Sequence, residues 1–265
     1  WYDHTEKTTT LNDLAGLDRK TYMACNYPKT WQEGLRTIGT MAAFLPEVID
    51  AMAGDCMNRI KVVHEGLDTS VANIFKPHMI GNYYSVGSDV SHGVGKDFHV
   101  TALLNVQTGE VPADIFSNNI TPEYFASQSV ILLKLFGSPW WWIENNDWGR
   151  TVINVAQELR YPNLGFEDEK KTKLGFHTGD HNRADVWGRL VPAINNRQIR
   201  IYNVMGLRQF QDIIKNSDKN GRFEAKSGGN DDYPMAVGIA WFKRKEVSTD
   251  LTPYKVHKSL VFAGR

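Results

Sequence analysis

Acidic residues stand at three places in this sequence where an apolar run ends or begins. Asp89 ends the run YYSVGSD, Glu144 follows WWWI, and the pair Asp231 and Asp232 precedes the apolar segment 234–242. Carboxylates brought together beside apolar walls repel one another and lose hydration unless a cation binds them. Mg²⁺ favours oxygen ligands, and two such ions can stabilise the attacking and leaving oxygens of a phosphodiester. The acids therefore predict metal-dependent phosphodiester hydrolysis.

Each of these acids also has an ordinary structural explanation. An Asp after a strand is commonly a turn residue, and Asp231 or Asp232 would cap a helix and complement its dipole. Glu144 would pair with Arg150 on the following helix. Because the three acidic positions lie on three elements whose ends can converge, we favour the metal interpretation.

Other motifs in the sequence are weaker. The run GVGK at 93–96 lacks the earlier glycine and the following Ser or Thr of a phosphate-binding loop, so ATPase activity is not expected in this chain. His177 and His181 have no HExxH motif or cysteine pair beside them, which favours surface or packing histidines over a zinc site. Trp140 to Trp142 would either stack nucleobases or form a core strand, and we favour the core strand.

The elements that must position the acids alternate between strands and helices. Strand patterns cover 83–89, 98–106, 110–116, 140–143 and 198–202, and helical patterns cover 121–136, 147–161, 183–195, 205–215 and a segment from 231. Pro112 predicts that the third strand is an edge. Residues 46–76 are partly helical, with Ile49, Met52 and Val63 among the candidate buried positions. This order indicates an α/β protein with a mixed sheet flanked by helices.

The composition is that of a globular protein and excludes several classes. With 42% hydrophobic and 23% charged residues, the chain is neither disordered nor collagen-like. Its two cysteines make no disulfide framework and fit a reducing compartment, and its most apolar run, 130–136, is too short to span a bilayer. The net charge is zero, but residues 1–180 sum to −7 and residues 181–265 to +7. The basic C-terminal third predicts a polyanion-binding face.

Three segments resemble the nuclease motifs of the large terminase subunits of tailed bacteriophages. VGSDVSHGVGKD at 86–97 is similar to their first motif, IENNDWG at 143–149 to their Glu-Asn-Asn motif, and GNDDYPMA at 229–236 to their closing Asp-Asp motif. The match covers about residues 77–245 in the right order, and residues 24–44 resemble the end of the family's ATPase region. Asn230 departs from the family, where His is common, and so does the Trp run, where β-branched residues are common.

The resemblance implies a ribonuclease H-like mixed sheet and an endonuclease that uses Mg²⁺ or Mn²⁺ to cut concatemeric double-stranded DNA with little sequence preference. Asp89, Glu144 and Asp232 would be the catalytic metal ligands, with Asp231, which is better placed as a cap, and Asp97 as further acids. The candidate phosphate contacts are Lys96, Arg150, Arg183, Arg189, Arg197, Arg208 and Lys226.

The resemblance also implies an organisation and a set of partners. Residues 1–45 would be the remnant of the motor region, 46–76 a connector, 77–245 the nuclease domain and 246–265 a basic tail. The partners would be DNA, the portal protein or procapsid and the small terminase subunit, in the host cytoplasm, with no membrane and no secretion. The alternatives are another ribonuclease H-like nuclease, such as a junction resolvase or a transposase, and a catalytically silent module that binds DNA or the portal.

Overall fold

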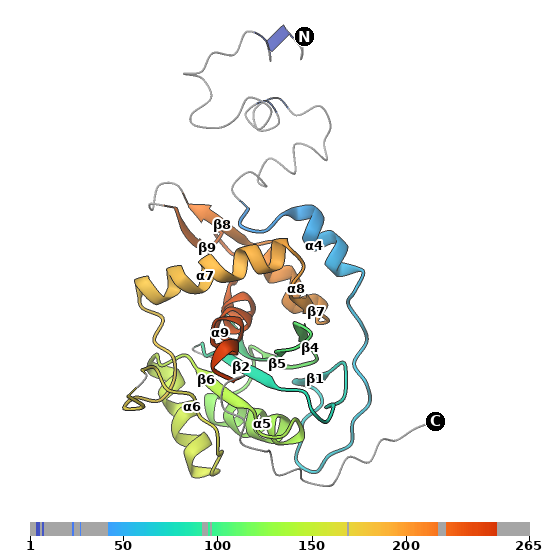
Figure 1. The fold of residues 1–265 in the computed structure, drawn as a ribbon. Helices are drawn as coiled ribbons and strands as arrows, with labels where there is room; N and C mark the ends of the chain where they lie inside the picture. The colour runs from blue at the N-terminus through green and yellow to red at the C-terminus, as the bar shows by residue number, and fades with distance from the viewer. Residues whose placement is uncertain are drawn as a thin grey trace.

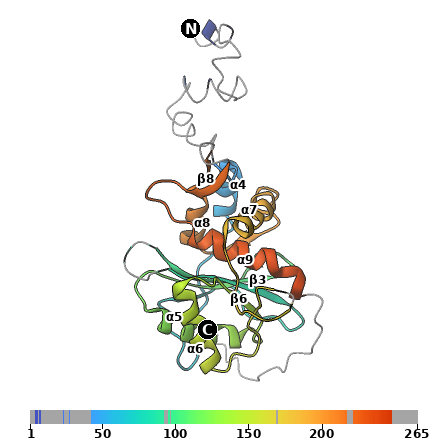
Figure 2. The same ribbon diagram turned by 90° about the vertical axis from the view of Figure 1, so that its left-hand side faces the viewer.

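The computed structural model describes residues 42–91, 95, 97–168, 170–216 and 221–247, and the isolated residues 4, 5, 7, 23 and 27. Its centre is a five-stranded mixed sheet in the order β1-β5-β3-β2-β6, with helices on both faces (Figures 1 and 2). The strands of this sheet are β1 (Ala72–Ile74), β2 (Tyr84–Asp89), β3 (His99–Asn105), β5 (Ala113–Ser117) and β6 (Trp140–Ile143). The predicted α/β class with a mixed sheet is confirmed.

Two short strand pairs and several helices complete the described part of the chain. The pairs are β4 (Glu110–Val111) with β7 (Arg200–Ile201), and β8 (Ile213–Asn216) with β9 (Arg222–Ala225). The helices are α4 (Pro46–Ala53), α5 (Pro122–Leu135), α6 (Asp147–Glu158), α7 (Asp180–Asn195), α8 (Val204–Phe210) and α9 (Asp232–Val247). None of the helices in these ranges combines the length and apolar character that crossing a membrane requires.

The central strands are buried on both sides. All seven residues of β3 are buried, because α9 covers one face of the sheet, with α7 packed on α9, and α5 and α6 lie on the other face (Figure 2). The sequence pattern of this strand predicts one buried face, and the second layer of helices adds the other. The polar side chains enclosed here bond one another: Ser88 Oγ accepts from Trp141 Nε1 at 2.7 Å and lies 2.7 Å from Thr101 Oγ1.

Pro112 divides the predicted third strand instead of marking a sheet edge. The chain breaks there into β4 and β5, and β5 lies between β1 and β3, so the expectation of an edge strand is wrong. Proline has no N–H to donate to a ladder, but its carbonyl accepts from the N–H of Phe75 at 2.8 Å. The edge on this side of the sheet is β1, so residues 72–74, within the segment 46–76, belong to the sheet.

Two helix starts agree with the sequence signals, whereas α7 begins at Asp180, three residues before its predicted start, and one helix end also differs. The side chain of Thr121 caps α5, and Asn146 caps α6 by accepting from the N–H of Gly149 at 2.7 Å. The helix predicted to reach residue 215 ends at Phe210, because the chain turns into β8. Val63 is 80% exposed, so its predicted place in the core is wrong.

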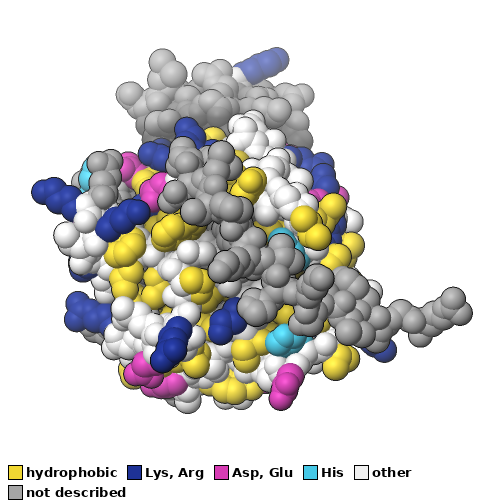
Figure 3. Space-filling model, turned by 60° about the horizontal axis from the view of Figure 1, so that its bottom comes forward, with side chains coloured by type: hydrophobic (Ala, Val, Ile, Leu, Met, Phe, Trp, Pro, Cys, Tyr) yellow, Lys and Arg dark blue, Asp and Glu magenta, His cyan; other side chains and the backbone are white. Residues whose placement is uncertain are grey.

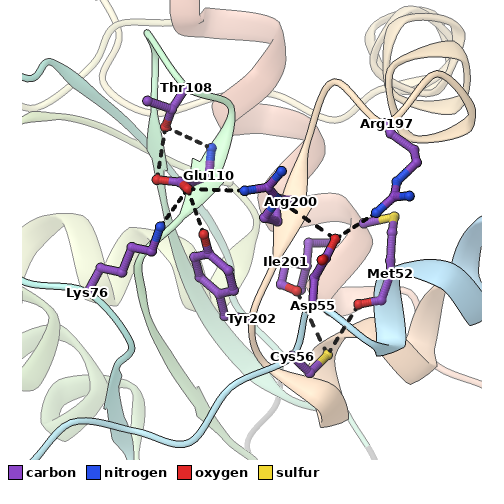
Figure 4. Close-up of polar contacts among 10 residues, drawn as sticks. All are labelled: Met52, Asp55, Cys56, Lys76, Thr108, Glu110, Arg197, Arg200, Ile201 and Tyr202. Carbon is purple, nitrogen blue, oxygen red and sulfur yellow. Dashed lines mark hydrogen bonds and ion pairs between the residues drawn. The ribbon is translucent and has the colours of Figure 1, made fainter.

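Ion pairs attach the segment after α4 to the β4–β7 pair (Figure 4). The carboxylate of Asp55 lies 2.8 Å from the guanidinium of Arg197 and 3.8 Å from that of Arg200. Glu110 lies 3.6 Å from Arg200 and accepts from the hydroxyl of Tyr202 at 2.6 Å. Arg197, a predicted phosphate contact, is therefore engaged in an ion pair within the fold.

Candidate active site

Two neighbouring parallel strands bring Asp89 and Glu144 side by side. In the register of β2 and β6, Ser88 stands opposite Ile143, and the N–H of Glu144 donates to the carbonyl of Ser88 at 2.9 Å. Asp89 is the last residue of β2, and Glu144 directly follows β6. Both acids therefore lie at the carboxyl edge of the sheet, where ligands bind in open α/β folds.

The start of α9 brings a third acid, Asp232, to the same edge. Ser85 Oγ donates to the carbonyl of Ala240 at 2.8 Å, and a Cβ on Gly87 would lie 2.1 Å from the carbonyl oxygen of Ala236. The helix thus lies directly on β2 and runs opposite to it. Asp232, one turn before Ala236, consequently lies near the end of the strand, beside Asp89.

Burial and mutual repulsion raise the pKa values of two of these carboxyl groups. For Asp89, burial is the largest of the causes that raise the pKa well above its usual range. The charge of Glu144, a hydrogen bond with Glu144, and the charges of Asp232 and Asp231 also raise it, in that order. For Asp232, burial and the charges of Asp231 and Asp97 raise the pKa to about 7. The N–H of Phe98 donates to this carboxylate, which lowers the pKa and offsets part of the rise. The structure therefore brings Glu144, Asp231 and Asp232 within electrostatic reach of Asp89, and Asp231 and Asp97 within reach of Asp232.

Glu144 is held by two side chains from different segments. Asn146 Nδ2 donates to Glu144 Oε2 at 3.2 Å and to the carbonyl of Val90 at 2.9 Å, and Thr178 Oγ1 donates to Glu144 Oε1. Gly149 lies so close that a Cβ there would be 1.7 Å from the carbonyl oxygen of Glu144, which explains the glycine of this motif. Thr178 was missed by sequence reasoning, since no pattern in the sequence sets it apart.

Asp231 and Asp232 have different electrostatic surroundings. The guanidinium of Arg183, from α7, pairs with Asp231 Oδ2 and lies 5.9 Å from the ring centroid of Trp187. Among the described residues, Asp232 has hydrogen bonds from Asn230 and the Phe98 N–H but no ion pair. Its side chain is buried, with 7% exposed, whereas that of Asp231 is 27% exposed. Of these two acids, Asp232 is therefore the one that has no ion pair within the described residues.

Replacing these two acids separately is expected to have unequal effects. Asp232→Asn removes the buried carboxylate without a counter-ion and should weaken Mn²⁺ binding roughly 100-fold or more, since even indirect changes around a metal cost 10–100-fold. Asp231→Asn should cost less, roughly 10-fold, because Arg183 already neutralises this side chain. Calorimetric titration of both variants with Mn²⁺ measures the difference, and equal losses would contradict the assignment.

The other predicted cations do not converge on the acids. Arg150 is exposed and donates from Nε to Asn145 Oδ1 at 3.4 Å, not to Glu144 as the sequence suggested. Arg189 packs over the ring of Phe242, and Lys226 pairs with Asp212 at 2.9 Å. On the face shown in Figure 3, Lys and Arg side chains are dispersed among hydrophobic and acidic ones. Lys96 lies outside the described residues.

The donor set at the sheet edge suits a hard divalent cation. In the described ranges, no three His, Cys, Asp or Glu side chains are arranged to hold an ion directly. However, Mg²⁺ keeps several waters and needs only one or two carboxylates, and the hydrogen bond between Asp89 and Glu144 occupies oxygens that a cation would take. A cation would also relieve the repulsion that raises the pKa of these acids. The residues present therefore fit such an ion.

Solved structures with the same fold are known, although no family model and no curated protein matches the chain. The large terminase nuclease from thermophilic phage G20c with bound magnesium has a TM-score of 0.54 and 13% identity, over 73% of this chain and 95% of that one. The large terminase nuclease domain of Thermus phage P74-26 has a TM-score of 0.55 and 14% identity, over 79% and 99% of the two chains. The chain therefore has the ribonuclease H-like fold of large terminase nucleases, and the predicted resemblance is confirmed at the level of fold.

Proposed function

We propose that this chain is the nuclease part of a phage large terminase, a metal-dependent endonuclease that cuts concatemeric double-stranded DNA during genome packaging. The main support is the convergence of Asp89, Glu144 and Asp232 at one edge of a sheet whose fold matches large terminase nucleases. The fold alone would not assign a function. Buried, mutually repelling acids at a strand edge add the chemical reason for a cation and a phosphodiester substrate.

In this proposal the carboxylates of Asp89, Glu144 and Asp232 hold Mg²⁺ or Mn²⁺. Bound ions of this kind polarise a phosphodiester and lower the pKa of a bound water, and the use of two ions stays a prediction. Thr178 and Asn146 orient Glu144, and the N–H of Phe98 orients Asp232. Such supporting contacts keep carboxylate oxygens in place for an ion.

The wider assignments are also part of this proposal. Residues 1–45 would end the motor region, and 46–76 would connect it to the nuclease domain at 77–245, whose sheet also includes β1 from residues 72–74. Residues 246–265 would form a basic tail that begins at the end of α9. The portal, the procapsid and the small terminase subunit would be partners in the host cytoplasm. Arg189 and other dispersed cations would contact phosphates, whereas Arg183 pairs with Asp231. Such backbone contacts would account for cutting with little sequence preference.

A plasmid assay tests the proposal directly. Supercoiled plasmid with Mn²⁺ should be converted to nicked and linear forms, and EDTA should prevent this conversion. A strong preference for a four-way junction over plasmid would instead favour a resolvase-like nuclease. DNA binding without cleavage at any Mn²⁺ concentration would identify a silent binding module and contradict the proposal.

The raised carboxyl pKa values predict how metal binding depends on pH. Metal ligands must lose their protons, and the pKa of Asp232 is about 7. Mn²⁺ should therefore bind roughly tenfold more weakly at about pH 6 than at about pH 8. Calorimetry at both pH values measures this, and equal affinities would contradict it.

The same shifts predict the stability of the metal-free protein. A folded-state pKa above the unfolded value means that the folded protein binds the proton more tightly. The free energy of unfolding should therefore fall as pH rises from the usual carboxyl range to about 7, and then level off. Thermal unfolding in EDTA across this range checks the sign.

A further inference from the structure

A pocket lies along the strand that leads to Glu144. Its volume is about 500 Å³, which is within the range of small-molecule sites. It lies between β6, residues 166–168 and 171, and the C-terminal part of α9, which crosses the sheet as Figure 2 shows. The side chains that matter most for its chemistry are Trp140, Trp142, Phe166, Lys171 and Lys243.

The pocket has an aromatic wall. Trp140 and Trp142 are two residues apart on β6, so they share the sheet face of Glu144, and their ring centroids are 6.2 Å apart at 31°. Trp142 is in the core, as the sequence analysis favoured, whereas Trp140 is half-buried. A Cβ on Gly165 would lie 2.3 Å from the indole of Trp142, so the absence of a side chain there lets the ring lie against the backbone. Nucleobases stack on such aromatic surfaces.

The acids around the pocket already have partners. Glu167 pairs with Lys173 at 2.8 Å, and Glu246 pairs with Lys243 at 2.7 Å. Asp168 accepts from the N–H of Thr172 at 3.0 Å. Two of the three lining carboxylates are therefore already neutralised by lysines, and the third accepts hydrogen bonds, which makes the pocket less suited to a cationic ligand such as a lysine-rich peptide.

Lys171, at the exposed rim of the pocket, differs from Lys243 in its contacts. In the described part of the chain, Lys171 makes no ion pair, and its ammonium lies 6.0 Å from the ring centroid of Trp140. Its backbone has φ 55°, a conformation that is uncommon for any residue but glycine. Strained residues of this kind tend to occur at ligand sites. An ammonium beside an aromatic wall complements a phosphate joined to a base.

We propose that this pocket binds a nucleotide, with its base against Trp140 and its phosphate at Lys171. The ligand is either a nucleotide of an unpaired DNA strand or a free nucleotide, and only the DNA source rests on the proposed function. Trp140 begins β6 and Glu144 directly follows it, four residues later, which is about 13 Å by strand rise. A DNA strand that reaches the acids would therefore pass within reach of the pocket.

Binding in EDTA tests the proposal without metal and without cleavage. The probe is a fluorescein-labelled single-stranded (dT)8, followed by anisotropy, with unlabelled dTMP and AMP as competitors. Trp140→Ala should weaken binding roughly 5- to 150-fold, the loss expected for one stacked base, whereas Trp140→Phe should retain most of it. Lys171→Gln should weaken binding several-fold, and the neighbouring exposed Lys170→Gln is the matched control.

Each outcome of this test has a defined meaning. Competition by dTMP or AMP that Trp140→Ala abolishes supports a free-nucleotide ligand, and Trp140-dependent binding of the oligonucleotide alone supports a DNA strand. Equal oligonucleotide affinity for the wild type and Trp140→Ala overturns the proposal, as does binding of a lysine-rich peptide in place of nucleotides. Plasmid cleavage with Mn²⁺ is measured separately, so a failure of the nuclease proposal is distinguishable from a failure of this one.

Discussion

Asp89→Asn and Glu144→Gln are each expected to reduce Mn²⁺-dependent plasmid cleavage roughly 100-fold or more. Residues that only support a metal ligand commonly cost 10–100-fold when changed, so loss of a ligand should reach at least the upper value. Both substitutions keep the size of the side chain and remove its charge. Initial rates of nicking at saturating Mn²⁺ measure the loss.

Stability measurements separate loss of function from loss of fold in these variants. In EDTA, Asp89→Asn should unfold at a higher temperature than the wild type, because a buried carboxyl group repelled by Glu144 and Asp232 is replaced by a neutral amide. The stabilisation that Mn²⁺ gives the wild type should be lost. The exposed Glu65→Gln is the control and should cleave normally. Near-normal cleavage by Asp89→Asn would show that Asp89 is not a ligand.

Gly87→Ala is expected to destabilise the fold by about 3 kcal/mol or more, at or above the upper end of typical overpacking costs. The new Cβ would lie 2.1 Å from the carbonyl oxygen of Ala236 and 2.6 Å from the nitrogen of Ala240. Both atoms belong to the backbone of α9, which cannot move without lifting the helix from β2. For a domain of this size the loss corresponds to roughly 6–12 °C in Tm.

Gly188 offers a matched control for this prediction. It lies in α7, and a Cβ there would meet no atom within 4 Å. Gly188→Ala should therefore stabilise the protein by roughly 0.5–1 kcal/mol through helix propensity. Thermal unfolding of the two variants in EDTA gives the comparison. A Gly87→Ala protein as stable as the wild type would contradict the close crossing of α9 over β2.

Local sequence signals predicted most of the elements around the site. Thr121 and Asn146 mark helix starts because their side chains satisfy free N–H groups, a property of a few neighbouring residues. The alternation of apolar residues and the run WWWI likewise depend on near neighbours. Elements whose limits depend on distant contacts were harder to predict. Pro112 suggested that the third strand is an edge, but β1 pairs with the outer side of β5 and so β5 lies inside the sheet.

The sequence by itself determined which acids are chemically notable. Asp89, Glu144 and the pair Asp231 and Asp232 stand at the ends of apolar runs, where an unpaired carboxylate needs an explanation. The same patterns left open which of the two adjacent Asp residues carries the uncompensated charge. They also gave no indication of Thr178, which contacts Glu144 across 34 positions of the chain.

Only the tertiary structure decided how these acids are related. The parallel pairing of β2 with β6 sets Asp89 beside Glu144, and the crossing at Gly87 brings Asp232 to them. Arg183 reaches Asp231 from a helix 48 residues earlier in the chain, whereas Asp232 has no ion pair within the part of the chain that the structure describes. Residue types and contacts between near neighbours can be deduced from the sequence. Charge compensation depends on distances between segments that only tertiary packing brings together.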